Sequence, residues 1–256
     1  MKIILFSVFI YSIFNYSLSY AKDEDFTVKK RTPQYGFFYG VFAGYQEELY
    51  KGIDNDVMAF PAIGYRGENL NILGPRISYR LYQQNQISLS AQLHYRFAGY
   101  DASDSRFFNG MEDRDATLDA GFSLAYKKND WTNANSMVTD MLGRSNGLEI
   151  SSQLGKTFYV GPIFIEPNIG LRYWDTNYVN YYYGVKASES TSGREEYKGG
   201  FALNKKLGIN VSTPIFLGGF TRLSIEHTWF DSVISRSPLI ESNSSFGVRL
   251  TFTRFF

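Results

Sequence analysis

The stretch that most constrains the fold is residues 246–256, where apolar and polar side chains alternate without interruption. Four apolar residues share one parity: Phe246, Val248, Leu250 and Phe252. Because a strand points successive side chains to opposite faces, this pattern predicts a strand with one apolar and one polar face. In a soluble sheet such a strand leaves an exposed edge, whereas in a closed barrel its apolar face meets lipid and both of its edges are paired. The pattern therefore favours a transmembrane barrel over a hairpin strand of a soluble sandwich.

The opposite end of the sequence is typical of a secretory signal peptide. A basic start precedes an almost wholly apolar run, and residues 19–21 (Ser-Tyr-Ala) form a small-x-small cleavage site. A retained helical anchor is disfavoured, because the apolar run is too short to span a bilayer comfortably. We therefore expect residues 1–21 to be a signal peptide cleaved after Ala21, residues 22–34 to be a periplasmic lead-in, and residues 35–256 to be the barrel.

Composition agrees with an exported barrel and excludes several classes of function. Aromatic residues make up 18% of the chain, which suits the aromatic girdles of a barrel, although a secreted sandwich could share this value. The chain has no cysteine, so thiol catalysis and thiolate metal sites are excluded. A net charge of +1 gives no argument for binding nucleic acid, and we expect none as a partner.

Segments of alternating hydrophobicity recur along the whole chain, and the cleanest covers residues 87–97. Eleven residues without a parity error match the length of a tilted membrane strand. The candidate strands are residues 35–46, 57–66, 69–82, 87–97, 118–126, 131–141, 147–155, 164–174, 199–211, 220–230 and 246–256.

Eleven strands conflict with the even number found in bacterial single-chain barrels. A hairpin hidden around residues 67–75 would give twelve, and merging the strands of residues 57–82 would give ten. We predict an all-β, single, antiparallel up-and-down barrel of about twelve strands, with ten as the alternative. Pro61 lies inside one candidate strand and predicts a bulge or an edge position there, because proline cannot donate to the ladder.

Short and long connections alternate, as they do between the periplasmic and external ends of bacterial barrels. Counting back from the last strand predicts four external loops: residues 98–116, 142–146, 175–198 and 231–243.

The inward-facing positions of the candidate strands include charged side chains of both signs. We predict that these line the lumen as a charge network: Arg76, Arg80, Arg96, Asp119, Glu149, Glu166, Arg172, Arg222, Glu226 and Arg249. A structural network is the first interpretation, since long side chains fill a narrow barrel. A small pore that favours anions is the second.

Two histidines are the candidates for an enzymatic function, and one acidic loop is the candidate for a metal site. His94 faces inward near serines, and a Ser-His pair is the minimum for acyl transfer, but the lumen is the wrong place to attack a membrane lipid. His227 faces lipid beside Trp229. The acids of residues 101–115 could bind a divalent cation, but they do not match an EF-hand, and pairing with the loop's own arginines is the preferred interpretation. We expect no catalytic residue, no metal and no cofactor.

The C-terminal Phe256, with Phe252 in the same strand, resembles the signal that the outer-membrane assembly machinery recognises in bacterial barrels. Several stretches also resemble the MipA/OmpV family of outer-membrane proteins. The most specific is residues 180–185, with Tyr181, Tyr182, Tyr183 and Gly184. The others are residues 61–65, the pair 113–114, residues 167–173 and the pair 237–238.

The family resemblance implies an outer-membrane barrel in contact with lipid and lipopolysaccharide. It also implies, as the first functional hypothesis, a non-enzymatic envelope scaffold for peptidoglycan biogenesis, with a lytic transglycosylase and a peptidoglycan synthase as partners. The alternatives are a small porin or uptake channel, a surface adhesin acting through residues 98–116 and 175–198, and a lipid hydrolase that uses His94.

Overall fold

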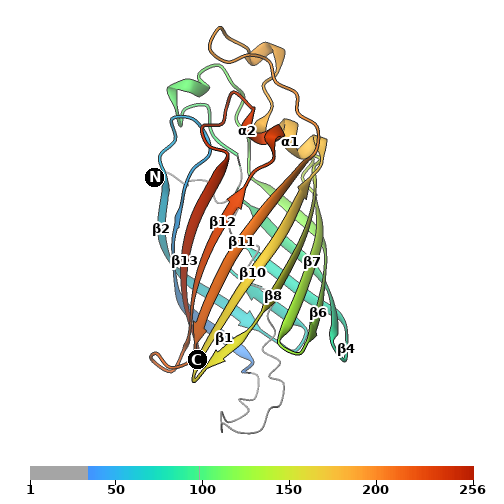
Figure 1. The fold of residues 1–256 in the computed structure, drawn as a ribbon, viewed down its shortest axis with the longest axis vertical. Helices are drawn as coiled ribbons and strands as arrows, with labels where there is room; N and C mark the ends of the chain where they lie inside the picture. The colour runs from blue at the N-terminus through green and yellow to red at the C-terminus, as the bar shows by residue number, and fades with distance from the viewer. Residues whose placement is uncertain (1–33, 98) are drawn as a thin grey trace.

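The computed structural model describes residues 34–97 and 99–256, and in these residues it has thirteen antiparallel strands (Figure 1). They are β1 (Gly36–Gln46), β2 (Asp56–Arg66), β3 (Leu70–Leu73), β4 (Arg76–Gln84), β5 (Ile87–Arg96), β6 (Thr117–Lys128), β7 (Trp131–Asp140), β8 (Leu148–Lys156), β9 (Phe158–Val160), β10 (Ile163–Trp174), β11 (Ala202–Thr213), β12 (Phe220–Trp229) and β13 (Ser244–Phe255). Twelve of them close a ring, because β13 pairs with β1 and β10 pairs with β11. The short β9 pairs with β10 where β8 ends and so extends β8 rather than adding to the ring.

This ring confirms the predicted all-β barrel of twelve strands. The twelfth strand is β3, in the region where a hidden hairpin was the alternative to a single long strand. The single strand predicted over residues 69–82 is therefore wrong: it turns at Gly74-Pro75, where Gly74 has a φ of 50°. A bulge between Arg80 and Tyr82 also shifts the register of β4 against β5.

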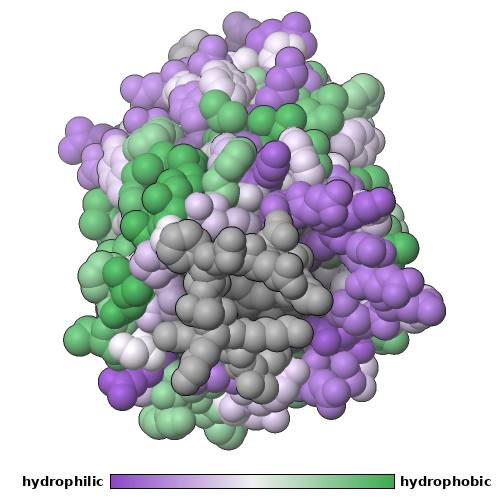
Figure 2. All heavy atoms as spheres, turned by 60° about the horizontal axis from the view of Figure 1, so that its bottom comes forward, coloured by the Kyte–Doolittle hydropathy of each residue, from purple (hydrophilic) through white to green (hydrophobic). Residues whose placement is uncertain are grey.

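Side chains alternate along the strands, with apolar ones facing the lipid and polar ones facing the lumen, as the sequence predicts. On β6, Phe122 and Leu124 are exposed on the outside, while Asp119 and its same-parity neighbours point into the barrel. Figure 2 shows hydrophobic side chains gathered on the left of the molecule and hydrophilic ones on the right. β7 alternates less cleanly, because its polarity is mixed: Asn133 and Asn135 face outward and Val138 is buried inside.

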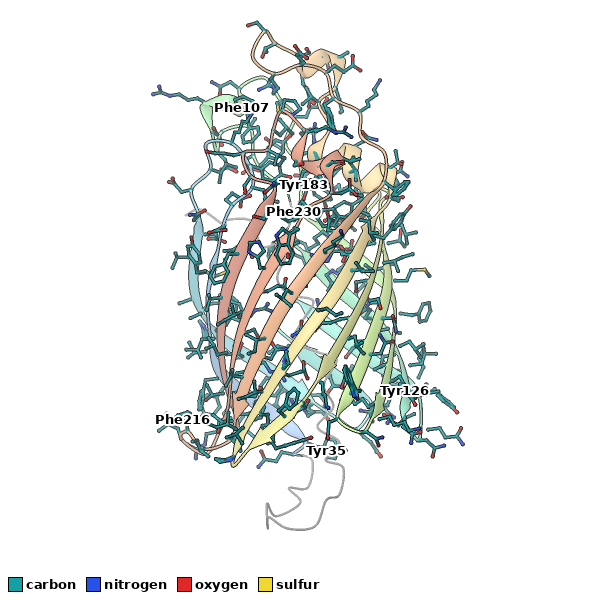
Figure 3. All side chains as sticks on the ribbon, viewed as in Figure 1. Tyr35, Phe107, Tyr126, Tyr183, Phe216 and Phe230 are labelled. Atoms are coloured by element: carbon teal, nitrogen blue, oxygen red, sulfur yellow. The ribbon has the colours of Figure 1, made fainter. Side chains whose placement is uncertain are left out.

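The long connections all lie at one end of the barrel, and the short turns, apart from the β3–β4 turn at Gly74-Pro75, lie at the other (Figure 1). By the asymmetry of bacterial barrels, the end with the long connections is external and the end with the short turns is periplasmic. In Figure 3, Phe107, Tyr183 and Phe230 mark the external end, and Tyr35, Tyr126 and Phe216 mark the periplasmic end. The external end carries helices α1 (Thr176–Tyr183) and α2 (Ser232–Ser235) and the 3₁₀ turns η2 (Arg106–Phe108) and η3 (Ala187–Glu189). None of the helices in the described residues is long and apolar enough to cross a membrane.

The predicted signal peptide, its cleavage after Ala21 and most of the predicted lead-in lie outside the described residues. Lys205, which breaks the lipid-facing pattern of β11, pairs with Trp229 near the external end of the strand. The register there is continuous and shows no bulge, and a lysine near the end of a membrane strand can extend its ammonium group to the interface. The predicted start of this strand at residue 199 is early, since β11 begins at Ala202.

Candidate functional site

Four external segments fold together over the mouth of the barrel. These segments are residues 47–55, 99–116, 175–201 and 230–243, and they are called the cap from here on. The sequence predicts external loops at residues 98–116, 175–198 and 231–243, but sixteen buried hydrophobic residues, most of them in the cap, form one core. Eight of these are aromatic: Tyr50, Tyr100, Phe108, Trp174, Tyr178, Tyr182, Tyr183 and Phe230.

Stacked rings hold the cap core together across segments that are distant in sequence. Tyr100 stacks on Phe108 with ring centroids 4.3 Å apart, and Tyr50 meets Tyr100 edge-on at 5.0 Å. Trp174, the last residue of β10, stacks on Tyr178 of α1 at 4.6 Å. Since each such aromatic pair contributes about 0.5–1.5 kcal/mol beyond its buried area, the cap is a packed domain and not a set of loose loops.

Backbone carbonyls of the Tyr181–Tyr183 motif anchor the other segments. The Tyr50 hydroxyl donates to the Tyr182 carbonyl at 2.9 Å, and the Ser237 hydroxyl donates to the Tyr183 carbonyl at 2.6 Å. Arg114 Nε donates to the Tyr181 carbonyl at 2.7 Å. The family-like motif residues therefore serve the cap: α1 ends within them, and Gly184 follows as its C-cap.

A buried ion pair joins the two longest cap segments. Arg114 Nη2 lies 2.8 Å from Glu189 Oε2, and both side chains are about 3% exposed or less. Arg194 Nε donates to the Glu189 carbonyl, and its Nη2 donates to the Asn109 carbonyl. Burial alone would raise the pKa of Glu189. However, backbone N–H donors from Lys186 and Glu112, together with the Arg114 guanidinium, hold this pKa below its usual value.

Directly below the cap, charged residues of the lumen form a connected network. Arg96 Nε donates to Asp119 Oδ2 at 2.6 Å, and Arg96 Nη1 donates to Glu149 Oε2 at 3.0 Å. Glu149 also lies 3.4 Å from Arg172 and accepts from Trp174 Nε1 at 2.9 Å. Arg96 Nη1 reaches the Tyr178 hydroxyl of the cap at 3.1 Å, so the network and the cap form one continuous structure.

The remaining members of the predicted lumen set lie around this centre. Glu226 pairs with Lys206 at 2.6 Å, and Arg249 is buried close to both Glu226 and Arg172. Lower in the barrel, Glu166 accepts from Asn210, and Arg222 donates to Ser212. Arg76 is buried and Arg80 is half-buried on the inward face of β4. The structure thus brings Arg96, Asp119, Glu149 and Arg172 into direct contact and places the other members beside them.

The two histidines take positions that do not favour acyl transfer. His94 is buried, and its Nε2 lies 3.3 Å from Asp119 Oδ2 inside the charge network. It sits below the cap and on the lumen side of the wall, away from the lipid face. His227 pairs with Leu207 and Phe246 on the lipid face, and its ring lies 4.4 Å from that of Trp229.

The acidic cap segment uses its carboxylates to hold itself together. Asp104 accepts from the Asp101 backbone N–H and Asp113 from that of Ala102. The predicted arginine partners within the loop are wrong, because Asp115 pairs with Arg144 and Glu112 with Lys186. In the part of the chain that the structure describes, no group of three or more His, Cys, Asp or Glu residues is placed to hold a metal ion.

The terminal aromatic residues lie on the outer face at the periplasmic end. Phe252 pairs with Val41 and faces lipid, and the ring of Phe256 packs 5.0 Å from that of Tyr39. Both residues are accessible from the membrane, and their role as an assembly signal stays a prediction.

Comparison with known proteins agrees with this architecture. The family model described as MltA-interacting protein MipA matches residues 39–256, which include all but the first residues of β1 and every later strand. Outer membrane protein Omp26La of Vibrio anguillarum is 28% identical over 211 residues, which are 82% of each chain. MltA-interacting protein of Escherichia coli strain K12 is 27% identical over 211 residues, which are 81% of this chain and 85% of that protein.

A solved outer membrane channel from Pseudomonas putida F1 aligns over 91% of this chain and all of its own, with 13% identity and a TM-score of 0.45. The family match spans most of the chain, and the relatives are named outer membrane proteins. The chain is therefore an outer-membrane β-barrel and belongs to the MltA-interacting protein (MipA/OmpV) family.

Proposed function

We propose that this protein is a non-enzymatic scaffold of the outer membrane that binds enzymes of peptidoglycan biogenesis at its periplasmic end. The observation that carries the proposal is the closed external end. A diffusion pore needs an open mouth, but here the aromatic cap core and the network of Arg96, Asp119 and Glu149 occupy the mouth, with these three side chains almost fully buried.

The periplasmic end offers one surface suited to a protein partner. Most of its turns are only two or three residues long, but the turn between β11 and β12 covers residues 214–219. Ile215, Phe216 and Leu217 in this turn are all more than half exposed, and Leu217 is 78% exposed at a φ of 50°. Exposed apolar groups held on a strained turn are typical of an interaction site rather than of an inert hairpin.

The name of the Escherichia coli relative supports this proposal, since that protein is described as interacting with MltA. By this likeness, the partners of the present chain are a lytic transglycosylase and, through the same complex, a peptidoglycan synthase. Its contacts with lipid, lipopolysaccharide and the assembly machinery follow from its place in the outer membrane.

Mild crosslinking in cells followed by purification of the barrel tests the proposal. We expect the wild-type protein to retain a murein hydrolase, and Phe216→Ser combined with Leu217→Ser to lose it. Val160→Ser is the control, because Val160 is about as exposed as Phe216 and lies next to another periplasmic turn. Absence of any murein enzyme from the wild-type sample would contradict the scaffold.

Single-channel recording in a planar bilayer tests the competing pore directly. The closed mouth predicts a silent barrel. Steady conductance that shifts when Arg96 or Arg222 is replaced would make the protein a channel, with the lumen arginines as its filter.

A further inference from the structure

The lipid-facing surface of the barrel carries polar side chains on two neighbouring strands, β7 and β8. Asn135 pairs with Leu124 of β6 on one side and with Ser152 of β8 on the other, so these three side chains share the outer face. Asn133 lies on the same face of β7, and Asn133, Asn135 and Ser152 are called the polar patch from here on. By contrast, the outward positions of β10 between residues 163 and 171 are all apolar. The polar patch therefore interrupts the apolar band of the wall.

The centre of the polar patch lies within the hydrocarbon layer. At the periplasmic end of β7, the Lys156 ammonium lies 5.4 Å from the centroid of the Trp131 ring, and Trp and Lys side chains of this kind anchor a protein at the membrane interface. Asn135 is four residues further along β7, which is about 13 Å at about 3.3 Å per residue. With a strand tilt of about 45°, Asn135 lies about 9 Å above that interface, inside an apolar band that is about 25 Å tall.

The amides of the polar patch are only partly hydrogen-bonded within the barrel. Asn135 Nδ2 donates to Asn133 Oδ1 at 2.6 Å, and Asn133 Nδ2 donates to the Gln153 carbonyl at 3.3 Å. Among the residues that the structure describes, no donor reaches Asn135 Oδ1 and no partner reaches the Ser152 hydroxyl. An amide oxygen without a donor is costly in hydrocarbon, where no water can replace the missing bond. The polar patch is therefore suited to a partner that brings polar groups to the same depth.

The remaining groups of Asn135 fit a second copy of this chain. Its amide keeps one acceptor, Oδ1, and one N–H, so two Asn135 side chains can each donate to the other. Two copies inserted in the same direction are related by a two-fold axis along the membrane normal, which brings residues of equal depth together. A patch of one charge would repel its own copy, whereas an amide is complementary to itself.

The sizes of the surrounding side chains also suit a contact between two walls. Asn135 and Ser152 are short, and small or polar residues let backbones approach closely in a membrane interface. Larger apolar side chains flank them: Leu124 is 45% exposed and Leu154, which pairs with Asn133, is 38% exposed. In a contact centred on Asn135, these leucines would pack around the amide pair and keep lipid away from it.

We propose that the outer face of β7 and β8 is the interface of a homodimer in the outer membrane, with the two Asn135 side chains paired across the two-fold axis. The dimer is independent of the scaffold proposed above. It uses the wall at β7 and β8, whereas the scaffold uses the periplasmic turn at residues 214–219, between β11 and β12.

Disulfide crosslinking in native outer membranes tests the dimer, because the chain has no cysteine and each introduced one is the single thiol of its copy. Asn135→Cys places that thiol on the proposed axis, and oxidation is expected to give a band of twice the barrel's mass. The control is Val41→Cys, which is 53% exposed on the outer face of β1, on the opposite side of the ring from β7.

Three results of the crosslinking would overturn the homodimer. They are no doubled band at position 135, equal bands at positions 135 and 41, and a band that joins position 135 to a different protein. If Asn135→Cys does not fold, Ser152→Cys with a bismaleimide linker replaces it, and the same results decide.

The mass of the purified full chain in mild detergent tests the role of the amide. The wild type is expected to be a dimer and Asn135→Leu a monomer, since leucine removes the amide pair and leaves the wall apolar. Met137→Leu is the matched control and should stay dimeric, because Met137 is 49% exposed on the same face of β7. The heat-modifiable band on gels shows that each variant is folded. A monomeric wild type, with or without bound lipid, or a dimeric Asn135→Leu would overturn the proposal. Neither result would change the murein enzymes captured through residues 214–219.

Discussion

The cap and the β2–β3 seam differ in how many contacts hold each of them. In the cap, four segments distant in sequence share one aromatic core, a buried ion pair and several bonds to the carbonyls of residues 181–183. At the seam, a three-residue ladder joins β2 to its neighbour. Among the described residues, the cap is therefore held by many cooperative contacts and the seam by few, so the two regions should respond differently to a single substitution.

The largest expected effect on the difference between cap and seam comes from Arg114→Ala, which destabilises the cap. Removing one partner of a buried ion pair leaves the other charge uncompensated, which costs about 3–5 kcal/mol. We expect the cap of this variant to become sensitive to proteinase K added outside liposomes, with cleavage within residues 99–116 and 175–201.

The matched control is Arg144→Ala, which removes the ion pair with Asp115. Each of these two side chains is 49% exposed, and an exposed pair contributes about 0–1 kcal/mol, so this cap should stay resistant. Equal cleavage of both variants would mean that the buried pair does not hold the cap closed.

The second prediction weakens the seam instead, with Gly64→Ala. A Cβ at this position would lie 2.2 Å from Phe38 Cζ and 2.5 Å from the Ile72 carbonyl oxygen, so the short ladder must shift. Overpacking of this kind costs about 1–3 kcal/mol. We expect a lower temperature for the loss of the folded, heat-modifiable band on gels, with the cap still resistant to protease.

Gly44→Ala is the control for the seam, since its Cβ would lie 3.2 Å from the Phe42 ring and would touch no backbone atom more closely than 3.6 Å. It should shift the melting temperature less than Gly64→Ala. A Gly64→Ala variant that also opened the cap to protease would show that the two regions are coupled, against the comparison made here.

The sequence predicted the strands of the barrel well and the cap poorly. Strands such as β5 and β13 follow a period of two, which a single sequence displays directly, and so the barrel and its polarity were predictable. The strand number was predictable only to within ten or twelve, because the four-residue β3 is too short to show a period of its own. The cap was not, because its order comes from contacts such as Tyr50 with Tyr183 and Arg114 with Glu189, which join segments far apart in the chain. Only the aromatic density near residues 178–183 hinted at a core.

One residue in the sequence indicated the seam, and the sequence predicted part of the lumen network. Pro61 indicated an edge or a bulge, and its continuous register with β1 shows no bulge there. Among residues 34–97 and 99–256, the ladder on the other side of β2 covers only Gly64–Arg66, which agrees with the edge. Parity placed Arg96, Asp119 and Glu149 on the inward face, but it could not show that Trp174 and Tyr178 would join them, because that contact depends on α1 folding back over the mouth.

The smallest expected effect is a dependence of cap stability on pH, caused by protonation of Glu189. Its pKa in the folded protein lies below the value of about 4.3 for a free glutamate, so its stabilising contribution is fully present above about pH 4.3. The contribution is lost as the pH falls through the lowered pKa, because protonation removes the charge that Arg114 and the N–H groups of Lys186 and Glu112 bind.

We expect the fluorescence of Trp174 in the cap core to report loosening in that acid range. Glu189→Gln should remove this acid step, whereas Glu195→Gln, an exposed carboxylate of the same segment, should leave it intact. An acid transition that is identical in all three proteins would assign the loosening to the carboxylates of the lumen network instead, and the cap would then depend on the barrel below it more than on its own ion pair.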